Sequence, residues 1–253
     1  MRHARLIAAA TLLVGALVAA VVLWPRAHDA PAAAPTTTTA TTLAATTTTI
    51  AQPAGEAADP VGDRVDLFSA PGDVLPLDTL SNPTGEGVAL AMLVKGRAPG
   101  WLHVQYPKRP NEAMAWVRAE QVTTRTVDNR IQVQVGTHTL TVYKGNTDQV
   151  LFQAPVATGT ARTPTPLGSF FVDIIVDLVY KTGVYGPYQV SVAGFSNVLQ
   201  SFGGGVGQIA IHGTNQPQLI GTDVSNGCIR MHNEDITALV ALIRTGSPVE
   251  VVA

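Results

Sequence analysis

IAIHGTNQPQLIGTDVSNGCIRM, residues 209–231, begins with an apolar run typical of a buried strand and ends just after the chain's single cysteine. His212 closes the apolar run, and Cys228 follows a Ser-Asn-Gly sequence. A cysteine is a strong nucleophile as a thiolate, and a nearby imidazole can take its proton. A strand, a loop and a second strand between the two residues would bring them together. We therefore predict a Cys228–His212 pair.

The residues around Cys228 suit a tight turn beneath a reacting carbonyl group. Gly227 lets the backbone approach that group closely because glycine has no Cβ. The amides of Asn226, Gly227 and Cys228 could then stabilise the oxygen of a tetrahedral intermediate. Arg230 follows two residues after Cys228, which on a strand puts both side chains on one face. We expect Arg230 to bind a substrate carboxylate or to order the loop.

Three motifs in this half of the chain resemble one enzyme family. HGT at 212–214, a spacer with Ile-Gly at 220–221, and SNGCIRM at 225–231 are similar to the signature of the L,D-transpeptidases, the YkuD-like catalytic domains. Family members typically have histidine where this chain has Asn226. The positions that match the family pattern are His212, Gly227, Cys228 and Arg230. The resemblance covers roughly the C-terminal half.

The resemblance implies an enzyme of peptidoglycan biosynthesis, and hence of cell-wall organisation and cell shape. Cys228 would hold the third residue of a donor tetrapeptide stem as a thioester, and an amine acceptor on a neighbouring stem would resolve it. His212 would act as general base and then general acid, with the Gly213 carbonyl orienting its ring. The resemblance also implies acylation by carbapenems, and no metal or other cofactor. The residues expected to shape the site and bind stem-peptide groups are Thr214, Ser225 and Arg230.

The residues leave three other functions open. With water as acceptor, the same thioester would make the chain an L,D-carboxypeptidase. A non-catalytic wall-binding protein would use only the region ahead of the catalytic domain, although intact Cys228 and His212 argue against it. A zinc peptidase would need His212, Cys228 and His232 as ligands, but neither HExxH nor Cys-x-x-Cys spacing is present.

Composition limits the partners. The chain has 253 residues, which is room for one large domain or two small ones. Its formal net charge of −2 and the absence of a basic stripe make nucleic acid an unexpected partner. One cysteine excludes an intramolecular disulfide, and a lone thiol in an exported protein needs a reason to persist.

Residues 1–26 resemble a membrane anchor. Arg2 and Arg5 precede an uncharged apolar run from Leu6 to Trp24, which as a helix would be about 28 Å long and close to the thickness of a bilayer core. Positive charge ahead of the run predicts that the bulk of the chain lies outside the cytoplasm, in the cell envelope. We expect an uncleaved transmembrane helix; cleavage near residues 26–34 would instead give a secreted protein.

The remaining chain is expected to be mainly β. Residues 27–60 are rich in Ala, Thr and Pro, which predicts a disordered tether. Residues 61–124 contain short strand patterns between turns, and GWLHVQYPKRPNEAMAWVRAEQV at 100–122 resembles the end of bacterial SH3-like domains, so we expect a small SH3-like barrel. A mostly antiparallel β-sandwich catalytic domain is expected over 127–253, with one helix in its C-terminal region.

Local patterns predict several details of that catalytic domain. A hairpin is expected over 131–142, and Asn233 is placed to N-cap the helix. Val249 to Val252 is expected to close the sheet as its final strand. TPTPLGSF at 163–170 resembles a further family segment, whose prolines would stiffen one wall of the cleft. The glycine-rich loop at 201–207 is no phosphate cradle, because no Gly-Lys-Ser/Thr follows it.

Overall fold

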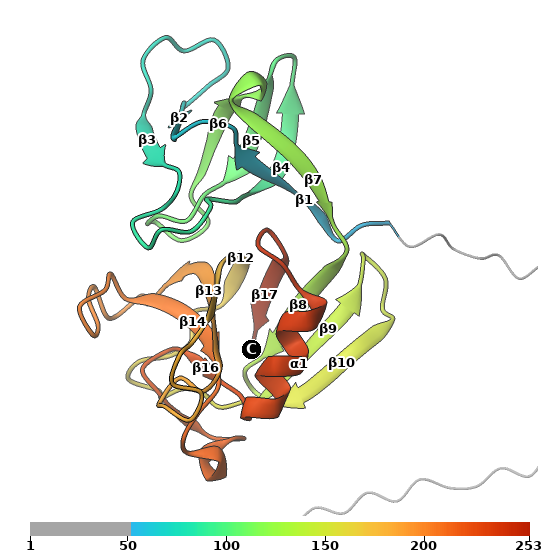
Figure 1. The fold of residues 1–253 in the computed structure, drawn as a ribbon, viewed down its shortest axis with the longest axis vertical. Helices are drawn as coiled ribbons and strands as arrows, with labels where there is room; N and C mark the ends of the chain where they lie inside the picture. Colours follow the sequence, from blue (N-terminus) through green and yellow to red (C-terminus); the bar gives the residue numbers. More distant parts are fainter. Residues whose placement is uncertain (1–51) are drawn as a thin grey trace, which may run out of the picture. The chain divides into compact units, whose positions relative to one another are not determined.

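The computed structural model describes residues 52–253. The predicted membrane anchor and most of the predicted tether lie outside these residues. Across 52–253, no helix is both long enough and apolar enough to cross a membrane. The described chain is mainly β with one α-helix, as the sequence predicts (Figure 1).

The first region, which we call the small domain, is an antiparallel sheet with the strand order β6-β5-β4-β1-β7. Its strands are β1 Gly55–Pro60, β4 Met92–Ala98, β5 Trp101–Gln105, β6 Met114–Arg118 and β7 Val122–Val127, with a 3-10 turn at Ala119–Gln121. A separate hairpin is formed by β2 Arg64–Leu67 and β3 Asp78–Ser81. The buried side chains that fill its core include Val65, Leu67, Met92, Val104 and Val117. Its SH3-like identity stays a prediction.

Strand β1 corrects the expected end of the tether at residue 60. It pairs with β7 along its whole length, from Gly55 opposite Val127 to Pro60 opposite Val122. Its alanines at 57 and 58 are fully buried. The alanine-rich composition suggested too little apolar surface for folding. The neighbouring strands supply the larger side chains, so small residues suffice here.

The second region, the catalytic domain, has an eight-stranded sheet with the order β10-β9-β8-β17-β12-β13-β14-β16. Its strands are β8 Asn129–Gln134, β9 Thr139–Lys144, β10 Val150–Pro155, β12 Gly168–Asp177, β13 Tyr188–Phe195, β14 Gln208–His212, β16 Ile229–Arg230 and β17 Pro248–Val252. A two-stranded sheet joins β11 Thr158–Gly159 to β15 Asp223–Ser225. The helical elements are the 3-10 turn Pro217–Leu219 and α1 Asn233–Leu242. The predicted hairpin is confirmed as β8–β9.

Strand β12 connects the two halves of this sheet. Its first residues, Gly168–Phe171, pair with β17, and the following residues pair with β13. Figure 1 shows β8, β9 and β10 on one side and β13, β14 and β16 on the other, with α1 between them. Buried side chains from both halves and from α1 form one core, among them Ile131, Val142, Val192, Ile211, Ile229, Ile236 and Leu239. The expected sandwich is therefore one continuous half-barrel sheet that wraps the helix.

Strand β17 is a second correction. Instead of closing the sheet, it lies inside it, antiparallel to β12 and parallel to β8. Val249 and Val251 are both buried, as expected for a strand with neighbours on both sides. Helix α1 provides the crossover that leads the chain back to this central position.

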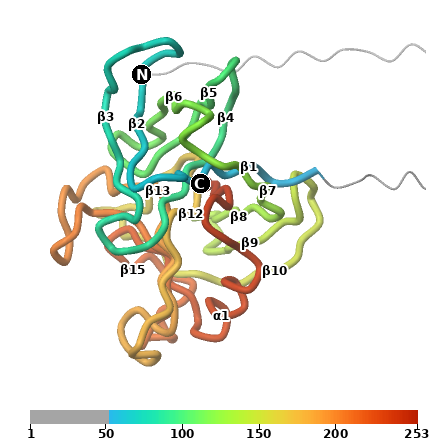
Figure 2. The backbone as a smooth tube through the Cα atoms, turned by 45° about the horizontal axis from the view of Figure 1, so that its top comes forward, coloured from blue at the N-terminus to red at the C-terminus, as the bar shows by residue number. Residues whose placement is uncertain are grey.

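The small domain packs against the catalytic domain through buried and polar contacts. Leu93 of β4, Phe171 of β12 and Ala193 of β13 form a small buried cluster. The Gln105 side-chain amide donates to the Ser169 carbonyl at 2.8 Å. Figure 2 shows the chain between β3 and β4 passing close to β12 and β13. The small domain thus contacts the strands that lead to β14 and the predicted site.

Candidate active site

Parallel pairing of β14 with β16 brings the two predicted reactive residues together. His212, at the end of β14, lies opposite Arg230 of β16, and Ile211 lies opposite Ile229. Cys228 comes directly before β16. Ile211 and Ile229 are buried and anchor both strands in the core. They thereby fix the positions of their neighbours His212 and Cys228. The predicted strand–loop–strand arrangement is confirmed.

The imidazole of His212 is held in one tautomer. Its Nδ1 lies 2.6 Å from the carbonyl oxygen of Gly213. Because a carbonyl oxygen can only accept, Nδ1 carries the proton and Nε2 is left as an acceptor. Burial lowers the pKa of His212 to about 4; the bond to Gly213 opposes this shift, and the charge of Arg230 adds to it. At neutral pH the ring is neutral and able to accept a proton.

His212, Cys228 and Arg230 line one pocket of about 150 Å³. The Tyr185 ring meets the His212 ring edge-on, with centroids 4.7 Å apart and an interplanar angle of 69°. The other lining residues are Val184, Phe202, Ser225 and Asn226. The groups that the sequence assigned to nucleophile, base and substrate binding therefore face the same hollow.

The surroundings of Cys228 favour its thiol form. Burial raises the pKa of its thiol, while the Ala210 backbone and the Arg230 charge act in the opposite direction. Among the described residues, no hydrogen bond joins its Sγ to the ring of His212. Because the pKa of Cys228 is raised and that of His212 is lowered, the resting pair is a neutral thiol and a neutral imidazole rather than a thiolate and an imidazolium. Proton transfer then has to accompany attack on a bound carbonyl.

Ser225 shapes the turn that carries the nucleophile. Its hydroxyl donates to the Cys228 carbonyl at 2.5 Å and accepts from the Gly227 amide at 3.0 Å. Gly227 has φ 117°, and a Cβ there would lie 3.0 Å from the Ile209 side chain, so glycine is required. The Gly227 amide is thus occupied, which leaves the amides of Asn226 and Cys228 as predicted oxyanion donors. Ser225, predicted to shape the site and bind substrate, is 1% exposed and holds the turn, while substrate binding by it stays a prediction.

Two threonines of the TPTPLGSF segment support the same turn. Thr165 accepts from the Gly159 amide and donates to the Gly227 carbonyl, both at 2.9 Å. Thr163 donates to the Ser225 carbonyl at 3.1 Å. The sequence suggested that this segment forms a cleft wall but gave these hydroxyls no role. The only local signal was the Thr-Pro-Thr-Pro repeat itself.

Thr214 orders the loop that follows His212, which is one of the two roles predicted for it. It is 3% exposed and is absent from the pocket lining. Its hydroxyl accepts from the Gln216 amide at 3.0 Å, and its own amide donates to Asn233 Oδ1 at 2.8 Å. These two bonds fix the Thr214 backbone and side chain within the loop, and contact of Thr214 with a ligand stays a prediction.

Asn233 corrects the predicted helix cap. The N-cap of α1 is His232, without a side-chain hydrogen bond, and Asn233 is the first helical residue. Its Oδ1 instead lies against Gly213, where a Cβ would approach it to 2.4 Å. A Cβ on Gly186, beside Tyr185, would come within 2.3 Å of the same oxygen. Close packing of the two glycines on Asn233 sets the loop that orients His212.

A larger pocket, about 420 Å³, also contains Cys228 and shares Tyr185 and Phe202 with the smaller one. One of its walls is the segment 202–207, which contains Phe202 and the glycine-rich turn. The Arg109 guanidinium of the small domain donates to the carbonyls at 196, 199 and 206, at 2.9, 3.0 and 3.2 Å. Asn111 exchanges hydrogen bonds with the Phe195 backbone at 2.7 and 2.9 Å. No sequence signal identified these two residues, because their partners lie in another domain.

Arg230 completes the site. Its backbone exchanges two 2.9 Å hydrogen bonds with Ala157, and its Nη1 lies 3.5 Å from Gln216 Oε1. The guanidinium lines the smaller pocket, as expected for a group that binds a carboxylate. His232 lies outside the lining of either pocket at Cys228. Within residues 52–253, no three His, Cys, Asp or Glu side chains are grouped to hold a metal ion.

Known proteins are similar to this chain over the region that contains the site. The L,D-transpeptidase catalytic domain (YkuD) family matches residues 128–251. The putative L,D-transpeptidase YkuD of Bacillus subtilis is 36% identical over 126 residues, 50% of this chain and 67% of that protein. The protein of the same name from Bacillus licheniformis is 35% identical over the same shares.

A solved structure of an Enterococcus faecium L,D-transpeptidase mutant is 20% identical, with a TM-score of 0.38, and the match covers 49% of each chain. The chain therefore spans about half the length of that solved protein. The family match and the identity to the two Bacillus proteins show that this chain belongs to the L,D-transpeptidase (YkuD) family.

Proposed function

We propose that this chain is a cysteine-dependent L,D-transpeptidase that joins peptidoglycan stem peptides through a thioester on Cys228. One observation carries the proposal. A neutral His212, with its proton fixed on Nδ1 by Gly213, lines the same pocket as Cys228 and Arg230. A nucleophile, a base in the correct tautomer and a cationic anchor in one hollow are the parts that acyl transfer requires.

In the acylation step, His212 Nε2 takes the thiol proton as Cys228 Sγ attacks the carbonyl carbon of the third stem residue. The amides of Asn226 and Cys228 are the proposed donors to the oxyanion. Collapse of the tetrahedral intermediate breaks the bond to the terminal D-alanine. The imidazolium gives its proton to the departing amine. The products are a thioester and free D-alanine, with His212 neutral again.

In the second step, an acceptor amine attacks the thioester carbonyl and gives a proton to His212. The thiolate leaves and takes that proton back, which regenerates the resting pair. Cys228 lies where the two pockets meet, at about 150 and 420 Å³. Two adjoining pockets that share Cys228, Tyr185 and Phe202 support a reaction with two peptide substrates. Hydrolysis, the carboxypeptidase alternative, needs room for only one.

The proposed substrate lies outside the cytoplasm, and so would the catalytic domain. Support comes from the sequence of the N-terminal segment, where arginines precede the apolar run from Leu6 to Trp24. We therefore propose that the enzyme is tethered to the membrane on its outer side. Protease treatment of intact cells, followed by detection of the catalytic domain, tests this: a domain that resists digestion until the cells are lysed contradicts the proposal.

The reaction is tested by intact-protein mass after the full-length chain meets a tetrapeptide donor. The mass should rise by the stem tripeptide acyl group, and addition of an amine acceptor should discharge it as a cross-linked peptide. Cys228→Ala should give no adduct with either the donor or a carbapenem. Discharge only by water would favour the carboxypeptidase. An unchanged mass with every donor and carbapenem would favour a non-catalytic wall-binding protein.

A further inference from the structure

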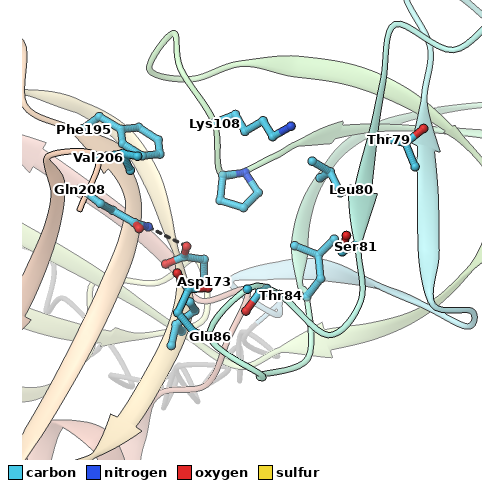
Figure 3. Close-up of a pocket in the computed structure, with 14 residues that line it drawn as sticks. Thr79, Leu80, Ser81, Thr84, Glu86, Lys108, Asp173, Phe195, Val206 and Gln208 are labelled. Carbon is cyan, nitrogen blue, oxygen red and sulfur yellow. Dashed lines mark hydrogen bonds between the residues drawn. The ribbon is translucent and has the colours of Figure 1, made fainter. Parts of the chain in front are cut away.

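A third hollow, of about 320 Å³, lies between the small domain and the catalytic domain (Figure 3). The chain between β3 and β4 contributes Thr84 and Glu86, and the catalytic domain contributes Asp173 of β12 and Gln208 of β14. The steps proposed for Cys228 use none of these residues. The hollow therefore lies close to the site but has no role in the proposed reaction.

Asp173 is an ionisable residue in an otherwise apolar strand, FFVDIIV at 170–176. The β12–β13 register shifts between Val172 and Ile174, so Asp173 is the extra residue of a β-bulge. Bulges redirect side chains and occur often beside functional sites. Asp173 is 5% exposed, and its Oδ2 accepts from Gln208 Nε2 at 2.7 Å. Its Oδ1 is buried and has no hydrogen-bond partner among the protein's groups.

A second polar atom in the same hollow lacks a partner. The Thr84 hydroxyl is buried and makes no hydrogen bond within the protein. Glu86 adds another carboxylate to the lining, whereas the cation that lines the hollow, Lys108, is already paired with Asp78 at 2.5 Å. Buried polar atoms without partners destabilise a fold and call for an explanation. Here two of them point to a ligand that donates hydrogen bonds and carries positive charge.

An alkylammonium group fits these requirements. It has three N–H donors, enough for a carboxylate, a hydroxyl and a second carboxylate. A hard metal cation would need about six oxygen ligands, and the described residues contain no group of three His, Cys, Asp or Glu placed to hold one. Burial raises the pKa of Asp173 to about 6. The Gln208 hydrogen bond and the backbone amides of Asp173 and Ile174 oppose this shift, and Glu86 adds to it. At neutral pH the carboxylate is mostly ionised and would be stabilised by a cation.

The hollow adjoins the larger pocket at Cys228. Glu86, Val206 and Gln208 line both of them. A peptide bound beside Cys228 can therefore extend a charged side chain past these residues toward Asp173. Stem peptides with a diamino third residue carry such a side chain.

We propose that this hollow binds an alkylammonium group of the peptide substrate, with Asp173 as its anionic partner and with Thr84 and Glu86 as further hydrogen-bond acceptors. The identity of the substrate rests on the function proposed above, but the chemistry of the ligand does not. The ammonium can belong to the donor stem or to the acceptor.

Binding is measured first, so that the result does not depend on turnover. The full-length Cys228→Ala chain is titrated calorimetrically with a stem tetrapeptide that has a free side-chain amine, and with the same peptide acetylated on that amine. The free amine should bind about tenfold to a hundredfold more tightly, the range of a charge-assisted hydrogen bond. Adding Asp173→Asn should remove this difference. Equal binding of the two peptides before that change, or an unchanged ratio after it, overturns the proposal.

Asp177→Asn is the matched control, since Asp177 is an exposed carboxylate on the same strand. It should keep the full preference for the free amine. Thermal unfolding checks the fold: Asp173→Asn should melt at a higher temperature than the parent at pH 7, with the gain shrinking toward pH 4. A preference lost equally in both variants would mean that a general charge effect, rather than this hollow, selects the amine, and would also overturn the proposal.

Kinetics then distinguish the two sources of the ammonium in the chain that retains Cys228. If the donor supplies it, acetylating the donor amine slows formation of the acyl adduct. If the acceptor supplies it, 1,5-diaminopentane discharges the adduct faster than 1-aminopentane. In either case Asp173→Asn abolishes the difference. Absence of any adduct refutes the proposed transpeptidation, while the calorimetric result still decides whether the hollow binds ammonium.

Discussion

The turn that holds Cys228 and the segment 196–207, which we call the first and the second wall, both contribute residues to the larger pocket, yet they are fixed by different parts of the molecule. The turn is held from within the catalytic domain, by the hydroxyls of Ser225, Thr163 and Thr165. The opposite segment is held by Arg109 and Asn111 of the small domain. In the proposed reaction, the first wall carries the nucleophile and the second faces the substrate.

Under the proposed function, this difference would separate reactivity from substrate binding. A nucleophile tolerates little displacement, and short hydrogen bonds within its own domain meet that need. The second wall depends on how the two domains pack, so a change in the small domain should alter the pocket without altering the thiol. The experiments below test whether the two walls can be perturbed separately.

The largest effect should come from the first wall, through His212→Ala. Loss of the proton acceptor should slow acylation by about a hundredfold to ten-thousandfold. Because the pKa of His212 is lowered to about 4, the wild-type rate should stay level as pH falls toward about 5. It should drop near pH 4, where Nε2 takes a proton. The pH dependence of adduct formation measures this, and an acid limb near the ordinary imidazole pKa would contradict the buried neutral ring.

Thr165→Val should damage the same wall without touching the reactive atoms. It leaves the Gly159 amide and the Gly227 carbonyl without their partner. The free energy of unfolding should fall by about 2–4 kcal/mol. Alkylation of Cys228 by iodoacetamide, unambiguous because the chain has one cysteine, should also change in rate. Thr123→Val, at an exposed threonine, is the control. Equal stability of the two variants would contradict the proposal that the Thr165 hydroxyl stabilises the turn that carries Cys228.

Arg109→Ala should affect the second wall alone. Three carbonyls of the segment 196–207 lose their common donor, so turnover of the peptide substrate should fall about tenfold, as for the loss of one to two kcal/mol. Iodoacetamide should still alkylate Cys228 at the wild-type rate. Arg97→Ala removes an arginine of the small domain that pairs with Glu56 instead and should leave both readings unchanged. A slower alkylation in Arg109→Ala would show that the walls are coupled.

Asn226→His should have the smallest effect. The Asn226 side chain is exposed, whereas its neighbours in the turn are held through Ser225. Surface substitutions of this kind usually change stability by less than about 0.5 kcal/mol. Acylation rates should therefore agree within about threefold. A large change in either direction would assign the side chain at 226 a part in substrate binding.

Local sequence patterns predicted much of this arrangement because they reflect local physics. The alternation around residues 131–142 follows from the period of a strand and gave the β8–β9 hairpin. The apolar spacing after residue 233 gave α1, with Ile236 and Leu239 buried. The pairing of β17 inside the sheet did not follow, because it joins Val251 to Val133 across the whole catalytic domain.

The site divides in the same way. The sequence alone predicted that Cys228, His212 and Arg230 lie together, and all three line one pocket. A thiol, an imidazole and a guanidinium have few substitutes in acyl transfer, and their spacing is distinctive. The sequence placed Gly213 beside the imidazole. It also predicted that Ser225 and Thr214 shape the site, and their hydroxyls do order their own turns; contact of either residue with a substrate stays a prediction. Whether a polar side chain meets a ligand or its own backbone depends on which hydrogen-bond partners the fold brings near.

Only the tertiary structure decided what surrounds the reactive pair. Arg109 donates to carbonyls about ninety residues away in the sequence. Asn233 fills the space that Gly213 and Gly186 leave free. A β-bulge directs the Asp173 side chain toward the hollow between the two domains. Each contact joins segments that are far apart in the sequence, and no local sequence pattern indicates that they meet. Chemical identity is a property of single residues and can be read directly. Proximity between distant segments arises when buried side chains from many strands pack into one core, and no short stretch contains that information.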